Sequence, residues 1–358
     1  MKILQIINSL ETGGAERLIV ETLPLLAKKD CKVDLLLLKD EETVFFNTLK
    51  EKHCSNIFTL GKSYYNPMYI FRMLKYVKNY DIVHVHLFPS QYFAAISSFF
   101  CNSKTKFIFT EHNTANNRIN NVFFKQIDKF IYSFYQKIIC ITPQVKETLK
   151  IKIGLDDSKL LVIQNGINLE DINAESKSSR EEFGFSIDDK LLIMVAGFRE
   201  QKDQDTVIKV LEKLPSTYKL LLVGDGARRS ILEKIIIEKN LENRVFLLGF
   251  RSDVFSLYKM SDIAILSSHW EGFGLAAAEA MACGIPVIAS NVDGLAQVVH
   301  GGGILFEKEN VNDLKDKIIS LENKERYISL SLDGLKKAQN YSLKTMVENL
   351  ISSYKTLL

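Results

Sequence analysis

The sequence predicts an α/β protein built from two doubly wound parallel sheets. The chain has 358 residues, more than one hydrophobic core usually serves. Short runs that are apolar throughout alternate with longer helical patterns, and this series restarts near residue 190. Strands of this kind, separated by helices, are typical of parallel sheets that are covered on both faces. We therefore expect two domains of similar architecture.

The β-rich runs appear in order along each half, with helical patterns between them. Each half opens with a strand, a turn and a helix, although no sequence identity between the halves is evident. In the first half the runs are 2–7, 32–38, 81–86, 106–112, 137–142 and 160–165. In the second half they are 191–197, 218–224, 244–249, 262–268, 286–290 and 303–306.

The segment 166–190 is polar, rich in Ser, Asp and Glu, and lacks a strong apolar period, so we interpret it as a linker. It gives a first domain of residues 1–168 and a second of residues 169–342. Ligands of doubly wound sheets bind outside the C-terminal ends of the strands. The cleft between the two halves is therefore where a ligand is expected.

Composition narrows the class of protein. Hydrophobic residues make up 46% and charged residues 25%, and the 46 basic and 43 acidic residues give a net charge of +3, which is too balanced to indicate a nucleic-acid partner. The start MKILQIINSLETGG resembles a first strand more than a signal peptide, and the apolar window 92–100 is too short to span a membrane. Five cysteines without a C-x-x-C pair fit a reducing cytoplasm.

Two glycine turns stand between a strand and a helix. Gly13 and Gly14 follow the first strand, and Gly272, Phe273 and Gly274 precede an Ala-rich helix that begins near Leu275. Glycine lets backbone N–H groups approach an anion at the positive end of a helix, so both turns could hold a phosphate. A tight turn without a ligand explains either pattern equally well when it is taken alone.

Two carboxylates are spaced as E-x7-E around the second turn. Glu271 precedes the turn, and Glu279 lies two helical turns on, among alanines that are typical of a helix packed against a sheet. Burial of a lone carboxylate costs several kcal/mol, roughly, unless a partner or a ligand hydrogen-bonds it. This spacing suits a ligand with hydroxyls on both sides of a phosphate group, such as a sugar and a ribose.

Lys202 and Arg199 lie in the turn after the first strand of the second domain. Each alone is more often a solvated surface charge. Because this turn and residues 271–279 follow strands of one sheet, both cations could reach a diphosphate bound at the same edge.

Together these residues resemble family 4 glycosyltransferases of the GT-B fold. The resemblance runs from about Lys2 to the C-terminus and is most specific over 190–306, where several motifs occur in order. The motifs are NGI (165–167), REQKD (199–203), LLLVGDGARR (220–229), the stretch 245–290 that contains SSHWEGFGLAAAEAMACGIPVIAS, and GGGILF (301–306).

The resemblance implies two Rossmann-like doubly wound domains that face each other across a cleft. Residues 1–168 would form the acceptor-binding domain and residues 169–342 the nucleotide-sugar-binding domain. The last helix, at about 343–358, would pack back on the first domain. The implied activity is that of a retaining glycosyltransferase of the hexosyltransferase type.

Site residues carry over one by one from the family. Glu271 would lie against the donor sugar, Glu279 would bind the ribose, and Lys202 would bind the donor diphosphate together with the helix amides at Gly274 and Leu275. Many members have an arginine where this chain has Gly197, so the role of Arg199 as a second cation is an open question.

In the first domain, Gly13 and Gly14 resemble the glycine loop that faces the phosphates, and His112 resembles a histidine near the donor sugar and acceptor. The implied partners are a nucleotide sugar as donor substrate and a glycan or lipid-linked acceptor, with no nucleic acid. Neither a cofactor nor a metal is implied, and no side chain is assigned as general base, because the departing phosphate takes the acceptor proton in the front-face route. Surface polysaccharide synthesis in a bacterium is the implied setting.

Three other functions were weighed. A nicotinamide oxidoreductase is disfavoured because Arg229 replaces the third glycine of the fingerprint that VGDGAR (223–228) could begin. A GT-B nucleotide-sugar epimerase stays open, and so does a catalytically silent sugar-nucleotide binding subunit. The presence of both Glu271 and Glu279 argues against the silent subunit.

Two further features have competing interpretations. His84, His86 and His112 could bind a metal together, but structural histidines are the commoner explanation. The helices predicted within 67–78 and 118–137 carry basic and aromatic residues and could dock on the anionic inner face of a membrane. Ordinary helices that bury their apolar face are the favoured alternative.

Overall fold

The computed structural model describes residues 1–101, 104–113 and 121–358. The chain divides into two compact units. Unit 1 contains Met1–Gly166 together with Leu343–Leu358, and unit 2 contains Ile167–Ser342. Within the described residues unit 1 has a seven-stranded sheet and unit 2 a six-stranded sheet, and all strand pairs are parallel. The predicted α/β class with two doubly wound sheets is therefore confirmed.

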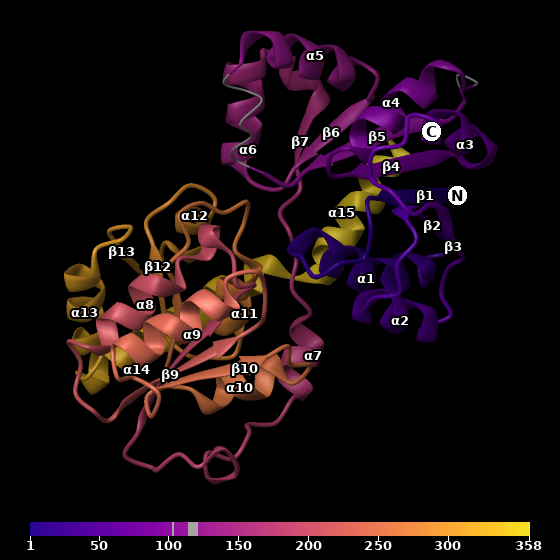
Figure 1. Ribbon diagram of the computed structural model, residues 1–358. Helices are drawn as coiled ribbons and strands as arrows, with labels where there is room; N and C mark the ends of the chain where they lie inside the picture. Colours follow the sequence, from indigo (N-terminus) through magenta and orange to yellow (C-terminus); the bar gives the residue numbers. More distant parts are fainter. Residues whose placement is uncertain (102–103, 114–120) are drawn as a thin grey trace. The chain divides into compact units, whose positions relative to one another are not determined.

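The sheet of unit 1 has the strand order β3-β2-β1-β4-β5-β6-β7. Its strands are β1 (Lys2–Ile7), β2 (Lys32–Lys39), β3 (Ile57–Gly61), β4 (Ile82–His86), β5 (Lys106–Glu111), β6 (Lys137–Cys140) and β7 (Leu160–Val162). Its helices are α1 (Gly14–Ala27), α2 (Val44–Glu51), α3 (Tyr69–Val77), α4 (Ser90–Phe99), α5 (Val122–Ser133), α6 (Pro143–Thr148) and α15 (Leu343–Lys355). Figure 1 shows these elements in indigo and purple, with α15 in yellow among them.

The sheet of unit 2 has the order β10-β9-β8-β11-β12-β13. Its strands are β8 (Lys190–Val195), β9 (Tyr218–Val223), β10 (Val245–Gly249), β11 (Ile263–Leu266), β12 (Val287–Ser290) and β13 (Ile304–Phe306). Its helices are α7 (Leu169–Ala174), α8 (Gln204–Leu211), α9 (Arg229–Glu238), α10 (Val254–Met260), α11 (Leu275–Ala282), α12 (Leu295–Val299), α13 (Val311–Ser320) and α14 (Lys324–Ala338).

Each sheet is buried because its central strands are apolar on both faces. In β1 every residue after Lys2 is buried, and β11 and β12 are buried along their whole length. β3 was not predicted from the sequence, and its residues are mostly half-buried. β3 is short, and Thr59 interrupts its apolar run, whereas the edge strand β10 keeps the unbroken run VFLL and was predicted.

The segment 166–190 is not a free linker. It forms α7, and the Arg180 guanidinium donates to the carbonyl of Met260 at 2.9 and 3.1 Å and pairs with Asp262 at 3.0 Å. Its polar composition hid this packing, because the segment is held by ionic and hydrogen-bonded contacts more than by an apolar face.

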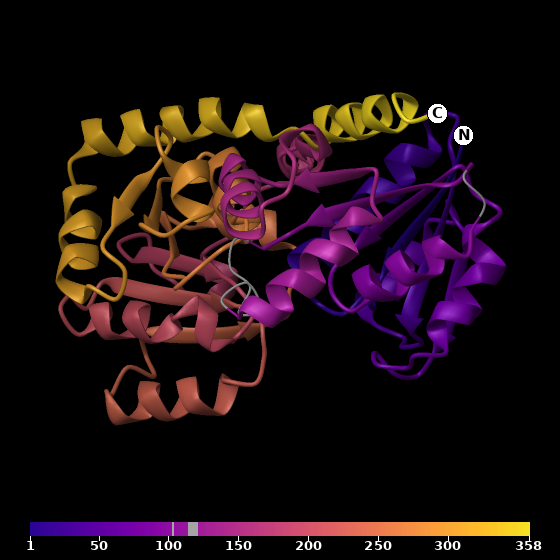
Figure 2. The same ribbon diagram turned by 90° about the horizontal axis from the view of Figure 1, so that it is seen from above.

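The last helix, α15, belongs to unit 1 and lies against α1. Figure 2 shows its final turns beside the start of the chain, where the labels of the two ends stand next to each other. Tyr354, which is fully buried, carries the end of this helix into the core of unit 1.

Candidate functional site

In unit 2 the candidate site lies at the point where the order of the strands reverses. β8 pairs with β9 on one side and with β11 on the other, so the loops after β8 and β11 diverge at the C-terminal edge of the sheet. Ligands of doubly wound sheets bind at such a switch point. The loop after β8 carries Arg199 and Lys202, and the loop after β11 carries Glu271.

Lys202 and Glu271 form an ion pair between these loops. Lys202 Nζ contacts Glu271 Oε1, and the same oxygen accepts a hydrogen bond of 2.8 Å from Ser268 Oγ. Glu271 is 7% exposed, so its charge is buried, and a buried carboxylate is tolerated when a cation and hydrogen-bond donors accompany it. Two predicted site residues that are 69 residues apart in the sequence are thus brought together.

The turn that carries Lys202 is fixed to the loop after β11 by its backbone. Ser267 Oγ donates to the carbonyls of Lys202 and Asp203 at 3.0 and 2.7 Å. The Gln201 amide donates to the carbonyl of Trp270 at 2.8 Å. These contacts hold the ammonium in place before any ligand arrives, which is what preorganised electrostatic stabilisation requires.

Gly274 begins α11 with a left-handed backbone, φ 86° and ψ 54°. A Cβ at this position would lie 2.5 Å from Leu295 Cδ1, so conformation and space both require glycine. The amides of the first helical turn have no partner within the helix and carry its positive partial charge. Leu275 supplies the first helical amide, and Phe273 before it is 2% exposed and packs edge-on against Tyr341.

Glu279 lies in the second turn of α11 and is 3% exposed. Its negative charge and burial together raise the pKa of the Cys283 thiol to about 12, with burial the larger cause. The second carboxylate of the E-x7-E pair is therefore within the helix packing, as the sequence predicted, whereas Gly272 lies in the turn before the helix.

Arg199 lies close in sequence to Gly197, the position where the resemblance implies an arginine. Its Nε is 3.6 Å from the place that a Cβ on Gly197 would occupy. The amide of Arg199 donates to the carbonyl of Gly197 at 2.9 Å, which folds this turn tightly. The guanidinium of Arg199 therefore lies close to the position that a side chain at residue 197 would occupy, although Arg199 is two residues later in the sequence.

In unit 1, the glycine turn after β1 has an acidic neighbour. The carboxylate of Glu16 folds back over the α carbon of Gly13, next to the N-terminus of α1, which begins at Gly14. A carboxylate at a helix N-terminus is stabilised by the same partial charge that would attract a phosphate. Neither glycine has a positive φ, so the turn itself does not require glycine at these positions.

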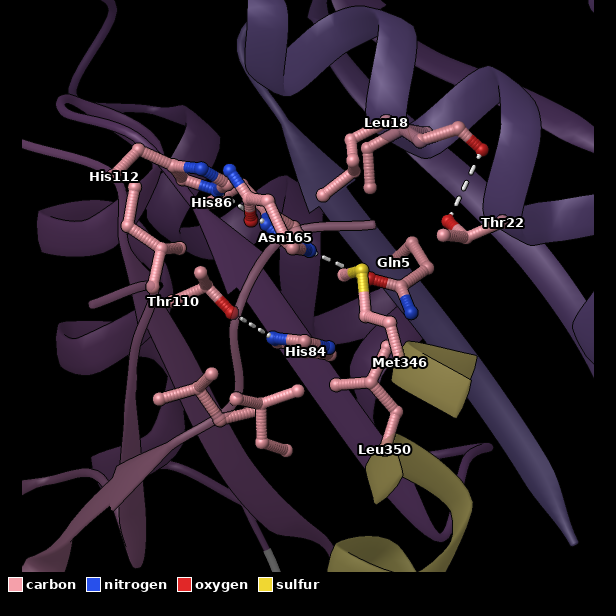
Figure 3. Close-up of a pocket in the computed structure, with 14 residues that line it drawn as sticks. Gln5, Leu18, Thr22, His84, His86, Thr110, His112, Asn165, Met346 and Leu350 are labelled. Carbon is pink, nitrogen blue, oxygen red and sulfur yellow. Dashed lines mark hydrogen bonds between the residues drawn. The ribbon is translucent and has the colours of Figure 1, made fainter. Parts of the chain in front are cut away.

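His84, His86 and His112 lie in one hydrogen-bonded chain of side chains in unit 1, and Figure 3 shows their rings with Gln5 and Thr110. His112 Nε2 is 3.0 Å from His86 Nδ1, and His86 Nε2 is 2.8 Å from Gln5 Oε1. Gln5 Nε2 donates to Tyr354 Oη at 3.3 Å, and that hydroxyl is 2.7 Å from His84 Nδ1. The chain ends where His84 Nε2 meets Thr110 Oγ1 at 2.6 Å.

Burial makes these imidazoles neutral. It lowers the pKa of His84 to about 3 and that of His112 to about 4, and it holds the pKa of His86 well below the ordinary 6.5. Both ring nitrogens of His84 are bonded to hydroxyls, so His84 does not turn a lone pair toward the other two rings. Among the described residues no group of three His, Cys, Asp or Glu side chains is placed to hold a metal ion.

A cavity of about 10 Å³ lies beside these hydrogen-bonded side chains. Asn165, His86, His112 and Gln5 are among the residues that line it. Within the described residues the Oδ1 atom of Asn165 is buried without a hydrogen-bond partner. The sequence analysis singled out Asn165 only as part of NGI. It missed Gln5 and Tyr354, although a glutamine within the apolar run KILQII was a signal.

Two protein-family models match this chain, one in each half. The model of Glycosyltransferase Family 4 matches residues 12–171, and that of Glycosyl transferases group 1 matches residues 175–342. The chain is similar to an uncharacterized glycosyltransferase of Methanocaldococcus jannaschii, at 32% identity over 64% of this chain and 62% of that protein.

Similarity also extends over nearly the whole chain. An N-acetylgalactosamine-N,N'-diacetylbacillosaminyl-diphospho-undecaprenol 4-alpha-N-acetylgalactosaminyltransferase of Campylobacter jejuni is 27% identical over 95% of this chain and 93% of its own. The crystal structure of Anabaena HepE in complex with UDP-glucose has a TM-score of 0.88 at 21% identity and covers 99% of this chain and 100% of its own, which shows a shared fold. The chain is a glycosyltransferase that belongs to family 4 and has the GT-B fold.

Proposed function

We propose that this protein transfers a sugar, with retention of its anomeric configuration, from a nucleotide-diphosphate sugar to a glycan or lipid-linked acceptor. The observation that carries the proposal is the buried Lys202–Glu271 pair at the switch point of the unit 2 sheet. A cation there can meet a diphosphate, and a carboxylate beside it can accept hydrogen bonds from sugar hydroxyls. Unit 1 would then bind the acceptor, with His112 near the reacting sugar.

The chemistry requires charge stabilisation more than proton transfer. When the bond between sugar and diphosphate breaks, negative charge grows on the phosphate oxygens and the sugar gains oxocarbenium character. Lys202 and the amides of Gly274 and Leu275 would stabilise the leaving diphosphate, since preorganised donors are usually the largest catalytic contribution. The departing phosphate would take the proton of the acceptor hydroxyl, so we assign no side chain as general base.

The names of relatives support a lipid-linked acceptor. The Campylobacter jejuni relative and an Escherichia coli UDP-Gal:alpha-D-GlcNAc-diphosphoundecaprenol alpha-1,3-galactosyltransferase both act on a sugar diphosphoundecaprenol. We therefore propose a role in surface polysaccharide synthesis, carried out in the cytoplasm on the inner face of the membrane.

The test begins with a panel of nucleotide sugars in a thermal-shift assay, because a ligand at 100 times its Kd stabilises the folded state by about 2.7 kcal/mol. The donor found is then incubated with undecaprenyl-diphosphate sugars, and the linkage of the product is read by NMR. Transfer with an unchanged anomeric configuration supports the proposal. Release of an epimerised free sugar would indicate the epimerase instead, and binding without any turnover would indicate a silent binding subunit.

Exposed aromatic residues of unit 1 support contact with an anionic membrane. On α5 the apolar side chains Val122, Phe123 and Phe130 are 76%, 70% and 62% exposed, and Lys129 is exposed among them. On α3, Phe71 is exposed, and the centre of its ring lies 6.4 Å from that of Phe100. Both helices also bury an apolar face, as the favoured alternative predicted, with Ile131 of α5 and Met73 of α3 in the core, and the exposed rings lie outside that face. Among the described residues no helix combines the length and apolar character needed to cross a bilayer.

Co-sedimentation with vesicles tests this contact. The parent should sediment with vesicles that contain phosphatidylglycerol and not with phosphatidylcholine vesicles, because Lys and Arg side chains favour an anionic surface. The double variant Phe123→Ser, Phe130→Ser should lose most of this binding. Ile237→Ser, which removes an exposed apolar side chain of unit 2, is the matched control. Equal sedimentation of the parent and the double variant would exclude α5 from the contact.

A further inference from the structure

The hydrogen-bonded chain of unit 1 links His112 to residues that no sugar or phosphate could touch directly. Gln5 is 2% exposed, and Tyr354 is fully buried. They come from the first strand and the last helix, β1 and α15, and meet at His86 and His84 on β4. An arrangement of this kind would be costly if any member were left without a partner.

Because the three imidazoles are neutral, the hydrogen bonds between these side chains all run in one direction from donor to acceptor. A neutral imidazole has one nitrogen that donates and one that accepts, so a hydrogen bond at one nitrogen fixes the role of the other. Because Gln5 Oε1 only accepts, His86 Nε2 must carry the proton, and His86 Nδ1 is then an acceptor. His112 Nε2, 3.0 Å away, must donate to it.

The same logic fixes the amide of Gln5. Its Oε1 faces His86 while its Nε2 donates to Tyr354 Oη, whose proton is then directed to His84 Nδ1. His84 Nε2 in turn donates to Thr110 Oγ1. If the amide were reversed, every bond in the chain would reverse with it, and His112 Nδ1 would become a donor. Because the Tyr354 hydroxyl can both donate and accept, it couples the orientation of the Gln5 amide, and with it the tautomer of His112, to His84 and Thr110.

We infer that Gln5 and His86 are positioning residues that hold His112 in the tautomer protonated on Nε2, so that Nδ1 presents a lone pair to a hydroxyl of the bound sugar or acceptor. Tyr354 of the last helix couples the Gln5 amide to His84, so that the two ends of the hydrogen-bonded chain keep one direction. The inference rests on the proposed function for the identity of the hydroxyl, but the tautomer itself is a property of the protein alone.

Ring nitrogen shifts of the full chain, labelled with 15N-histidine, report the tautomer directly. His112→Gln identifies the His112 signals among those of six histidines. In the parent at pH 7 we expect His112 to be protonated on Nε2, with about a tenfold excess over the other tautomer, the scale that one hydrogen bond sets. In Gln5→Leu the acceptor for His86 is gone, and a sizeable fraction of His112 should become protonated on Nδ1.

Tyr354→Phe is a smaller change that tests the same inference if Gln5→Leu does not fold. It should shift the His112 tautomer in the same direction, because the Gln5 amide loses its partner and is no longer coupled to His84 and Thr110. Tyr135→Phe is the matched control, since Tyr135 is equally buried and its hydroxyl donates to the carbonyl of Gln91, outside the chain. A parent protonated on Nδ1, or a His112 tautomer that neither variant changes, would overturn the inference.

Kinetics separate this inference from the proposed function. If the parent transfers sugar, Gln5→Leu should lower kcat by about tenfold, the scale of one lost hydrogen bond, and leave the affinity for the nucleoside diphosphate unchanged. A merely structural defect would lower both, together with the melting temperature. If the parent transfers no sugar from any donor, the proposed function fails, while the nitrogen shifts still decide the tautomer.

Discussion

Lys202 and Glu271 are 69 residues apart in the sequence and form one ion pair at the edge of the unit 2 sheet. Both are candidates for direct contact with the donor, one with its diphosphate and the other with its sugar. Since they already compensate each other's charge, a bound donor does not meet an isolated buried carboxylate. Each residue can therefore be tested through a different part of the donor.

Replacement of Lys202 by alanine should weaken binding of a nucleoside diphosphate by about 1–3 kcal/mol, the scale of a lost charge-assisted hydrogen bond. Isothermal titration calorimetry on the parent and the variant measures this. Lys202→Gln keeps a donor for Glu271 and should lose nearly as much affinity, because the charge is gone in both variants. Lys209→Ala, an exposed lysine of α8, is the control. Unchanged affinity in both Lys202 variants would remove this residue from the diphosphate site.

Replacement of Glu279 and of Glu271 should affect the binding of different parts of the donor, the nucleotide and the sugar. Glu279→Gln keeps the shape of the side chain but removes a charged acceptor, so affinity for the nucleoside diphosphate should fall with or without an attached sugar. Glu271→Gln should leave that affinity nearly unchanged and lower kcat/KM for the nucleotide sugar. Calorimetry and transfer rates on both variants decide between these outcomes, with melting temperatures as the control. If Glu279→Gln binds as the parent does and melts at a higher temperature, its carboxylate is not a ribose ligand.

Transfer should persist in excess EDTA, because Lys202 and the amides of α11 are expected to stabilise the diphosphate without a metal. The measurement is the transfer rate after dialysis against EDTA, with and without added Mg²⁺, Mn²⁺ or Zn²⁺. A rate that EDTA abolishes and one of these ions restores would mean that the donor diphosphate is bound through a metal after all.

The buried histidines should make unit 1 sensitive to acid. Their pKa values lie below the ordinary 6.5, at about 3 for His84 and about 4 for His112, so the unfolded chain binds protons that the folded chain excludes. Stability is thus unaffected above pH 6.5 and falls as the pH drops from 6.5 toward 4. For His84 alone the loss reaches about 3 kcal/mol at pH 4.5, at about 1.4 kcal/mol per pH unit.

Melting temperatures between pH 7.5 and 4.5 measure this loss. His84→Gln should melt lower than the parent at pH 7 and show a shallower decline toward pH 4.5, because one buried titrating group is gone. His300→Gln, which removes an exposed histidine of unit 2, should decline as the parent does. A decline in His84→Gln as steep as that of the parent would assign the acid sensitivity to other groups.

Much of the fold could be predicted because its inner strands are recognisable in the sequence as short apolar runs. Runs such as 2–7 and 191–197 are apolar on both faces, so position and type follow from composition alone. β3 was not predicted because Thr59 interrupts its short apolar run. The interaction of Arg180 with Asp262 was not predicted because an ion pair leaves no periodic pattern in the sequence. Lys137 begins β6, as the run 137–142 predicted, so the helix expected within 118–137 ends earlier, at Ser133.

Some residues of the candidate sites could likewise be predicted from the sequence, and others could not. Glu271, Glu279 and Lys202 stand in short motifs with fixed spacing, so the sequence alone can single them out. Gln5 and Tyr354 have no motif, and they meet His84 and His86 because parallel pairing sets β1 beside β4 and α15 returns to unit 1. Partners that only the topology brings together are not visible in a linear pattern. Glu16, which folds over Gly13, was likewise hidden, because a local side-chain conformation decides its place.

The return of α15 also sets an order of events during synthesis. The ribosome completes Met1–Gly166 first, but Gln5 and His84 receive their Tyr354 partner only when the final residues have emerged. Unit 2 is by then fully synthesised, and domains generally fold as units during translation. The half of the protein that is made first is therefore completed last, and a chain that ends at Ser342 would contain all of unit 2 but lack the helix that completes unit 1.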